Sequence, residues 1–531
     1  MVQTTASSFC LTLCIVACTE GNSTAVLSNS DIPSDSSSVA ADVSLQDIFS
    51  PGDARHPIET VESSDLVFSS DSKNSDSNAN EDDTHSPTQC EPNAPCEVPG
   101  AWCDGANCES SCICGPMGAW VCGVFNGAGC GPGNKSCFSA GGCDECTCSG
   151  GTWSCASVKK PKPNVAPSML PPISSLPLGC TVMPGDTTAP SALQRRWIDN
   201  AEARNAICND GSPGAYYMRP GTGLNAKKWL IHLKSGAGCQ DYCSCRERWL
   251  KEGDEKMSSS CWEATLNVDG IFNPDPTMNP EFHDWTVIFV RYCTSDSHLG
   301  DAAAQPEWGG IHWRGHRIVV AIVEDLENPA INPTHNLNDA THVLMTGSSA
   351  GSAGVRHYLD WMADRMGSGV QVRGVLDASM KPEQAYAPVF GEPNTTIAAT
   401  KNPWVDASCL NATGSKEACL THTWTLLNHV TTPFFAKMTQ RDAIALGNLD
   451  TTSDEAYQFA ADVRELMDPV NGHLPPGTGS YSRDGTSHID LTSDYFTTLT
   501  YQGLSFRDVL VHWIGDKQPV EDFPHVLIEY P

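Results

Sequence analysis

Residues 342–354 constrain the fold of this chain more than any other stretch. They read His-Val-Leu-Met-Thr-Gly-Ser-Ser-Ala-Gly-Ser-Ala-Gly, and residues 342–346 have the pattern of a short buried strand. Residues 347–351 fit G-x-S-x-G, and apolar residues then recur at helical spacing: Val355, Tyr358, Leu359, Met362 and Met366. A chance match in a chain rich in glycine and serine is the alternative, which the flanking strand and helix oppose. The stretch predicts a tight turn that lifts the hydroxyl of Ser349, the candidate nucleophile, above a sheet.

The region from residue 178 onward alternates apolar strands with helical periods, as an α/β fold does. A helix is expected at residues 317–326, where Ile318, Ile322 and Leu326 share one face. Strands are expected at residues 229–233, 285–291, 370–376 and 433–439. Together with the nucleophile turn, this order predicts an α/β fold in a large domain that starts near residue 178.

Residues 90–160 hold two copies of a six-cysteine repeat with a period of 34 residues. The cysteines are Cys96, Cys103, Cys108, Cys112, Cys114 and Cys122, then Cys130, Cys137, Cys143, Cys146, Cys148 and Cys155. Each copy permits three disulfides, whose connectivity the sequence leaves open, and zinc at the Cys143-x2-Cys146 pair is the rival interpretation. We expect a small disulfide-rich region that acts as a rigid spacer or as a carbohydrate-binding or protein-binding module.

The compartment follows from the 25 cysteines, which are too many for a reducing cytosol. Residues 9–17 are apolar but too short to span a bilayer, so residues 1–18 are predicted to be a signal peptide. Its end, Ile-Val-Ala-Cys, resembles a bacterial lipobox in which Cys18 is the lipid attachment site, and an ordinary cleaved signal is the alternative. An extracellular or cell-surface location is expected, as an outer-membrane lipoprotein if Cys18 is acylated.

Two segments read as connectors. Residues 19–89 carry 14 acidic and 2 basic residues without a hydrophobic period, which predicts a disordered acidic tether. Residues 161–177 are rich in proline and predict a stiff linker. The net charge of the whole chain is −31, which argues against nucleic acid as a partner and against electrostatic docking on anionic membrane.

An esterase needs backbone N–H donors for the oxyanion of its tetrahedral intermediate. The residue after the nucleophile, Ala350, supplies one donor. Residues 234–239, Lys-Ser-Gly-Ala-Gly-Cys, follow an early strand and are expected to supply the other, with a simple turn as the alternative. Cysteines crowd this region, and disulfides among them would hold the loop still: Cys239, Cys243, Cys245 and Cys261.

The base and the acid should follow the nucleophile in the order Ser…Asp…His. Asp442 lies just beyond an expected strand, and Asp377 is the runner-up because it also closes one. His488 lies in a polar loop able to fold over the site, whereas His512 is expected to pack in the core. His473 and His525 have no informative context, and spacing alone leaves the choice of histidine open.

Residues 206–351 resemble the pectinacetylesterase/Notum family of serine hydrolases. Residues 279–293 read Asn-Pro-Glu-Phe-His-Asp-Trp-Thr-Val-Ile-Phe-Val-Arg-Tyr-Cys, close to a run typical of that family. Residues 313–318, Trp-Arg-Gly-His-Arg-Ile, and 323–326, Val-Glu-Asp-Leu, are similar to its next helix. The nucleophile turn resembles Gly-Cys-Ser-Ala-Gly-Gly, and weaker similarity continues to Asp442.

This resemblance implies an α/β-hydrolase-like fold, with a central, mostly parallel sheet flanked by helices, over residues 178–531. It also implies ester hydrolysis without cofactor or metal. It implies that Ser349 is the nucleophile, Asp442 the acid and His488 the base. Gly236, Ala237 and Ala350 would form the oxyanion hole. The chain departs from the family at Ser348, where cysteine is usual, at Ser352, where glycine is usual, and within the oxyanion segment at Lys234, Ser235 and Gly238.

The substrate is less constrained. The plant branch of the family removes acetyl groups from pectin, whereas Notum removes a fatty acyl group from a protein. The acidic charge of the chain favours neutral acetylated glycans or lipid esters over pectin, which is itself polyanionic. We expect a monomeric enzyme that hydrolyses O-acyl, foremost O-acetyl, esters of polysaccharide. The alternatives are a Notum-like deacylase of lipid or protein esters, and a catalytically decayed surface protein for glycan binding or adhesion.

Overall fold

The computed structural model describes residues 191–378, 380–382, 394–447, 449–468, 474–475, 477–515 and 524–531. It also describes Cys143, residues 172–176 and 178, and the backbone of six short strands between residues 102 and 157. The predicted signal peptide with Cys18, the predicted tether at 19–89 and His473 lie outside the described residues, so the predicted domain boundaries stay predictions.

Each cysteine repeat carries a three-stranded antiparallel sheet. The strands are β1 (Trp102–Cys103), β2 (Cys112–Cys114) and β3 (Trp120–Cys122), then β4 (Ser136–Phe138), β5 (Asp144–Ser149) and β6 (Thr152–Ser157). Cys143 of the second repeat forms a disulfide with Cys243, 100 residues further along the chain. The zinc interpretation of Cys143 is therefore wrong, and this repeat does not close all its disulfides within itself.

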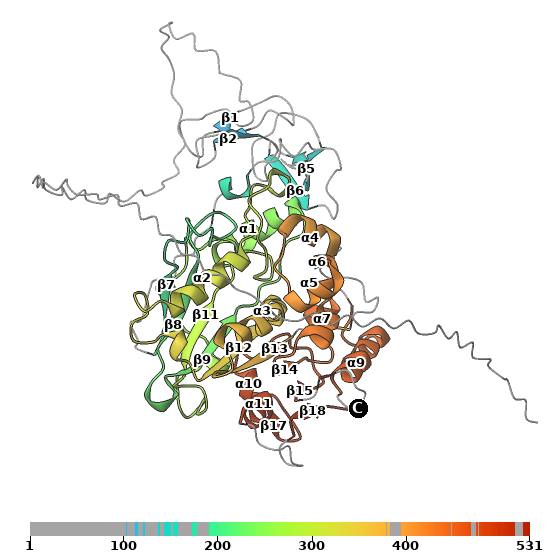
Figure 1. The fold of residues 1–531 in the computed structure, drawn as a ribbon. Helices are drawn as coiled ribbons and strands as arrows, with labels where there is room; N and C mark the ends of the chain where they lie inside the picture. The colour runs from blue at the N-terminus through green and yellow to red at the C-terminus, as the bar shows by residue number, and fades with distance from the viewer. Residues whose placement is uncertain are drawn as a thin grey trace, which may run out of the picture. The chain divides into compact units, whose positions relative to one another are not determined.

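The large domain is built on a ten-stranded sheet with the order β10-β7-β8-β11-β9-β12-β13-β14-β15-β18, which Figure 1 shows running across the molecule. The strands are β7 (Leu193–Trp197), β8 (Ala215–Arg219), β9 (Lys228–Leu233), β10 (Thr265–Leu266), β11 (Thr286–Val290), β12 (His342–Ser348), β13 (Gln371–Asp377), β14 (Phe434–Lys437), β15 (Gly479–Ser482) and β18 (Val526–Ile528). Every pairing from β11 to β18 is parallel, and only the β10-β7-β8-β11 edge is antiparallel.

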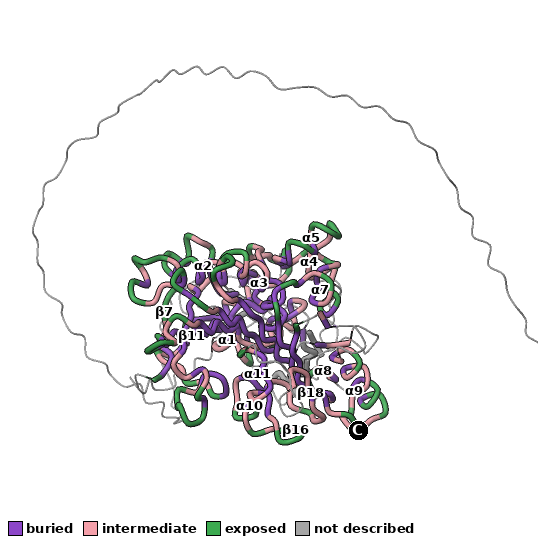
Figure 2. The backbone as a smooth tube through the Cα atoms, turned by 60° about the horizontal axis from the view of Figure 1, so that its bottom comes forward, coloured by how far each residue is buried: buried purple, intermediate pink, exposed green. Residues whose placement is uncertain are grey.

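Helices cover both faces of the sheet, and Figure 2 shows the buried strands between α2 and α3 on one side and α10 and α11 on the other. The helices are α1 (Tyr242–Lys256), α2 (Gly315–Glu327), α3 (Ala350–Met366), α4 (Asn394–Lys401), α5 (Ala407–Thr413), α6 (Lys416–Cys419), α7 (His422–His429), α8 (Ala443–Leu446), α9 (Asp454–Met467), α10 (Tyr495–Thr498) and α11 (Phe506–Ile514). A small hairpin joins β16 (Thr500–Tyr501) to β17 (Leu504–Ser505). No helix among the described residues is both long and apolar enough to cross a bilayer.

The sequence patterns explain why the central strands lie inside. All five residues of β11, Thr-Val-Ile-Phe-Val, are buried, because a parallel strand covered on both faces needs a continuous apolar run. On α3 the predicted apolar face is buried at Val355, Tyr358, Leu359 and Met362, and Met366 packs at its edge. The predicted strands and helices all form within a few residues of their expected bounds, and the predicted fold class is confirmed.

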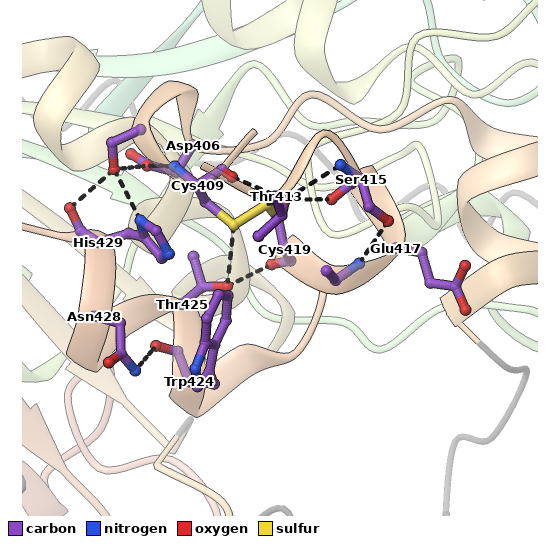
Figure 3. Close-up of a disulfide and its surroundings, with 12 residues drawn as sticks. Asp406, Cys409, Thr413, Ser415, Glu417, Cys419, Trp424, Thr425, Asn428 and His429 are labelled. Carbon is purple, nitrogen blue, oxygen red and sulfur yellow. Dashed lines mark hydrogen bonds between the residues drawn. A yellow bond between two sulfur atoms is a disulfide. The ribbon is translucent and has the colours of Figure 1, made fainter. Parts of the chain in front are cut away.

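A disulfide between Cys409 and Cys419 joins α5 to α6 (Figure 3). The side chain of Asp406 caps α5 by accepting the N–H of Cys409 at 2.9 Å. The hydroxyl of Thr425, on α7, donates to the carbonyl of Cys419 at 2.8 Å. These contacts hold three short helices together beside the carboxyl end of the sheet.

Candidate active site

Ser349 occupies the turn between β12 and α3, with φ 52° and ψ −116°. Positive φ is rare outside glycine and costs about 1–3 kcal/mol, so the surrounding structure must hold it. The N–H of Ser349 donates to the carbonyl of Asp377 at 2.8 Å. The predicted nucleophile therefore stands on a sharp strand-to-helix turn at the carboxyl end of the sheet.

Gly351 is the glycine that this turn needs most. A Cβ there would lie 1.8 Å from the carbonyl oxygen of Leu233 and 3.0 Å from that of Lys234. Gly351→Ala should push α3 away from β9 and lower the free energy of unfolding by about 3 kcal/mol. Gly369→Ala is the matched control, because no atom lies within 4 Å of its Cβ. Urea denaturation measures both variants, and equal stabilities would contradict this close approach.

Asp442 and His488 meet beside the sheet. The Nδ1 of His488 lies 2.7 Å from the Oδ2 of Asp442. The carboxylate of Asp442 is fully buried at the start of α8, and its Oδ1 accepts the N–H groups of Ile444 at 2.9 Å and Ala445 at 3.0 Å. A carboxylate beside Nδ1 favours a proton on that nitrogen, which leaves Nε2 free to accept one.

The competing candidates lie elsewhere. Asp377 is buried, but its carboxylate binds the N–H groups of Asp490 and Leu491 and not a histidine ring. His512 is buried in α11, as expected for a core residue, and its ring contacts that of His525 at a centroid distance of 5.3 Å. Of the candidate histidines and carboxylates that the structure describes, His488 and Asp442 form a pair.

A cavity of about 230 Å³ opens at the carboxyl end of the sheet, and both Ser349 and His488 line it. Ala350, the first residue of α3, also lines it, and its N–H has no acceptor within the helix because it belongs to the first turn. On the facing loop Ala237, Gly238, Cys239 and Gln240 line the cavity, and Gly236 directly precedes them in the chain. Gly236 is needed there because a Cβ would approach the ring of Tyr292 to 2.5 Å.

The facing loop is held in a strained conformation by several contacts. Ala237 has φ 53°, and its carbonyl accepts the hydroxyl of Tyr292 at 2.7 Å. Burial raises the pKa of Tyr292, so the phenol keeps the proton that it donates. Cys239 is bonded to Cys245, and its carbonyl accepts the ammonium of Lys401 at 2.8 Å. The loop is therefore fixed by one disulfide of its own, while Cys243 is bonded to the second repeat.

The cavity wall is cationic although the chain is acidic. Arg356 and Lys401, both buried, and the half-buried Lys381 line it. Burial lowers the pKa of Lys381, and the nearby carboxylate of Asp442 opposes that shift. Asp296 is the acidic residue among the described lining residues, and burial raises its pKa to about 6. Sequence reasoning missed these residues, since none belongs to a recognisable motif.

Two residues that depart from the family pattern, Ser348 and Ser352, form hydrogen bonds beneath the turn. The hydroxyl of Ser348 donates to the carboxylate of Asp377 at 3.2 Å. The hydroxyl of Ser352 lies 2.5 Å from the carbonyl of Gly347 and 2.7 Å from that of Asp377. Both side chains are fully buried, and neither residue lines the cavity. Among the described residues, no group of three or more His, Cys, Asp or Glu is placed to hold a metal ion.

Comparisons with known proteins bear on the family of the chain. The family model described as pectinacetylesterase matches residues 187–464, just over half of the chain. Pectin acetylesterase 5 of Arabidopsis thaliana is 32% identical over 191 residues, which are 36% of this chain and 43% of that protein. The palmitoleoyl-protein carboxylesterase NOTUM of Schmidtea mediterranea is 32% identical over 180 residues, 33% of this chain and 32% of that protein. The matches therefore span less than half the length of these relatives.

The fold has a counterpart among solved structures. The crystal structure of the Wnt deacylase Notum from Drosophila matches with a TM-score of 0.53 and 22% identity, covering 61% of this chain and 93% of that one. At this identity the likeness concerns the fold alone. The family model carries the assignment further, because it includes both the nucleophile turn and Asp442. The chain belongs to the pectinacetylesterase family.

Proposed function

We propose that this protein is a carboxylic ester hydrolase that removes short acyl groups, foremost O-acetyl, from polysaccharide. The observation that carries the proposal is His488, paired with the buried carboxylate of Asp442, in one cavity with a serine on a strained strand-to-helix turn. Membership of the pectinacetylesterase family supports it, as do relatives named pectin acetylesterases and palmitoleoyl-protein carboxylesterases.

The mechanism follows from the proton positions. His488 takes the proton of the Ser349 hydroxyl at Nε2 as the oxygen attacks the ester carbonyl, and Asp442 holds the Nδ1–H that fixes the ring. The N–H of Ala350 and those of the loop at Gly236 and Ala237 stabilise the oxyanion. His488 then gives its proton to the leaving alcohol. Water attacks the acyl-enzyme by the same route in reverse, which releases the acid and restores the serine.

The lining of the cavity favours a short acyl group. Apolar side chains also line the cavity, among them Leu299, Ile397 and Leu420. A long alkyl chain would nevertheless have to lie against the half-buried Lys381, and stripping water from a charged group without replacing its hydrogen bonds is costly. The cations of the cavity wall produce a local field opposite to the net charge of the chain, so an acidic glycan can approach this cavity despite the charge of −31. The argument from net charge against pectin is therefore weakened at the cavity itself.

A series of p-nitrophenyl esters tests the acyl preference. From acetate to palmitate, kcat/KM should fall by about 10-fold or more, because a lengthening alkyl chain must lie beside the charged side chain of Lys381 in the cavity wall. A preference for palmitate would instead support a Notum-like deacylase. Labelling by a fluorophosphonate probe is expected, and its absence would support the catalytically decayed glycan-binding protein. Acetylated pectin compared with acetylated xylan then separates acidic from neutral polysaccharides.

The proposal includes the location of the enzyme. Disulfides within the large domain join Cys208 to Cys293, Cys239 to Cys245 and Cys409 to Cys419, which supports an oxidising, extracellular compartment. We infer that the protein is secreted or attached to the cell surface, as a monomer with a signal peptide at residues 1–18. Lipidation of Cys18, if it occurs, would add an anchor.

A further inference from the structure

Asp377 is a buried carboxylate at the carboxyl end of the sheet that the proposed chemistry does not use. It ends β13, in register with Ser348 at the end of β12 and with Lys437 at the end of β14. All three side chains are fully buried. Parallel strands bring their carboxyl ends to one edge, so this row lies directly beneath the turn that carries Ser349.

One side of Asp377 holds the nucleophile turn. Its carbonyl accepts the N–H of Ser349 at 2.8 Å and the hydroxyl of Ser352 at 2.7 Å. Its Oδ2 accepts the hydroxyl of Ser348 at 3.2 Å. Residues on both flanks of the nucleophile are therefore bonded to this single aspartate.

The other side of Asp377 holds the loop of the base. The same Oδ2 accepts the N–H groups of Asp490 and Leu491, each at 2.9 Å. These residues come two and three positions after His488 in the chain. Backbone N–H groups that converge on one carboxylate oxygen fix the path of the loop, because charge-assisted hydrogen bonds are short and strong.

Lys437 completes the connection. Its Nζ lies 3.1 Å from Asp377 Oδ1 and 2.9 Å from Asp490 Oδ2, and it approaches the carbonyl of His488 at 3.4 Å. Burial raises the pKa of Asp377, and the ammonium of Lys437 opposes that shift. A buried charge cluster of this kind contributes little net stability compared with apolar packing. We therefore interpret it as a device that fixes the positions of the segments it joins.

We propose that Asp377, with Lys437, is a positioning residue that fixes the separation between the Ser349 hydroxyl and the His488 imidazole. It touches neither substrate nor reacting atoms. Its carboxylate bonds the base loop and the hydroxyl of Ser348, and its main-chain carbonyl bonds Ser349 and Ser352 of the nucleophile turn. The inference rests on the proposed function. It predicts that substitution of Asp377 lowers kcat and leaves substrate binding unchanged.

Two substitutions of Asp377 remove its side-chain contacts to different extents. Asp377→Ala removes every side-chain contact and should lower kcat for p-nitrophenyl acetate by about 100-fold at constant KM, the loss expected when reacting groups move by about 1 Å. Asp377→Asn keeps an oxygen for the N–H groups of Asp490 and Leu491 but turns an amide donor toward Lys437. It should lose about 10-fold, a partial rescue by the conservative change. The rate of fluorophosphonate labelling should fall in the same ratios.

Asp325→Asn is the matched control. Asp325 is also buried, pairs with a cation, Arg204, and accepts a backbone N–H, that of Asp199 at 2.9 Å. This variant should lose thermal stability and keep kcat, because Asp325, on α2, and its partners Arg204 and Asp199 do not line the cavity.

Asp377 variants with a lowered Tm but unchanged kcat would show a merely structural role and overturn the inference. If Asp377→Ala does not fold, the kcat of Asp377→Asn tests the inference instead. If the protein without any substitution shows no turnover, the proposed function is overturned as well. This outcome distinguishes a failure of the proposed function from a failure of the inference about Asp377.

Discussion

Ser349→Ala should abolish ester hydrolysis, lowering kcat for p-nitrophenyl acetate by about 10⁶-fold, as removal of a catalytic serine does in serine hydrolases. The oxyanion donors and the Asp442–His488 pair would remain, but no oxygen would be left to form the acyl-enzyme. The turn should survive, because Ser349 is bonded to Asp377 through its backbone N–H and not through its hydroxyl. Thermal melting should therefore change little while turnover disappears.

Ser453→Ala is the control for the loss of a hydroxyl. Ser453 caps α9 by accepting the N–H of Ala456 at 3.2 Å, outside the cavity. This variant should lose some stability and keep its turnover. Full activity in Ser349→Ala, measured with a protein that the fluorophosphonate probe still labels, would place the nucleophile elsewhere.

Asp442→Asn should lower kcat by about 10⁴-fold while the protein stays folded. Asparagine caps helices as well as aspartate does, so its oxygen can still accept the N–H groups of Ile444 and Ala445. Its amide group, however, would donate to Nδ1 of His488. The ring would then carry its proton on Nε2, the nitrogen that has to accept the proton of Ser349.

Asp406→Asn makes the same change at another buried helix cap, the one shown in Figure 3. Activity should be unchanged there. The two variants should differ in turnover and not in circular dichroism. Comparable activity in both would mean that Asp442 acts only as a helix cap and that another group orients His488.

The sequence predicted the architecture because the architecture depends on local patterns. Apolar runs such as β11 and the apolar face of α3 have one way of being buried, and the turn at Ser349 needs glycine on both sides. The choice between Asp442 and Asp377 was harder, since both follow strands. What separates them is the direction of each side chain, toward His488 or toward the backbone of Asp490, and this depends on contacts between distant segments.

The cavity wall shows the same limit. Arg356 lies one residue after Val355 on α3, where a cation beside an apolar stripe is usually read as solvent-exposed. The structure buries it in the cavity lining instead. Its position depends on short helices that approach from residues 394–429, and no local pattern around Arg356 contains that information.

The bond between Cys143 and Cys243 has a consequence for how this protein would respond to a protease. Proteolysis of any single peptide bond between those two positions would nick the polypeptide without releasing either piece. The second repeat would travel with the large domain as a two-chain molecule until a thiol opened the bond. Detachment from a support, if the N-terminal part provides one, would then need a cut upstream of Cys143 or a reductant.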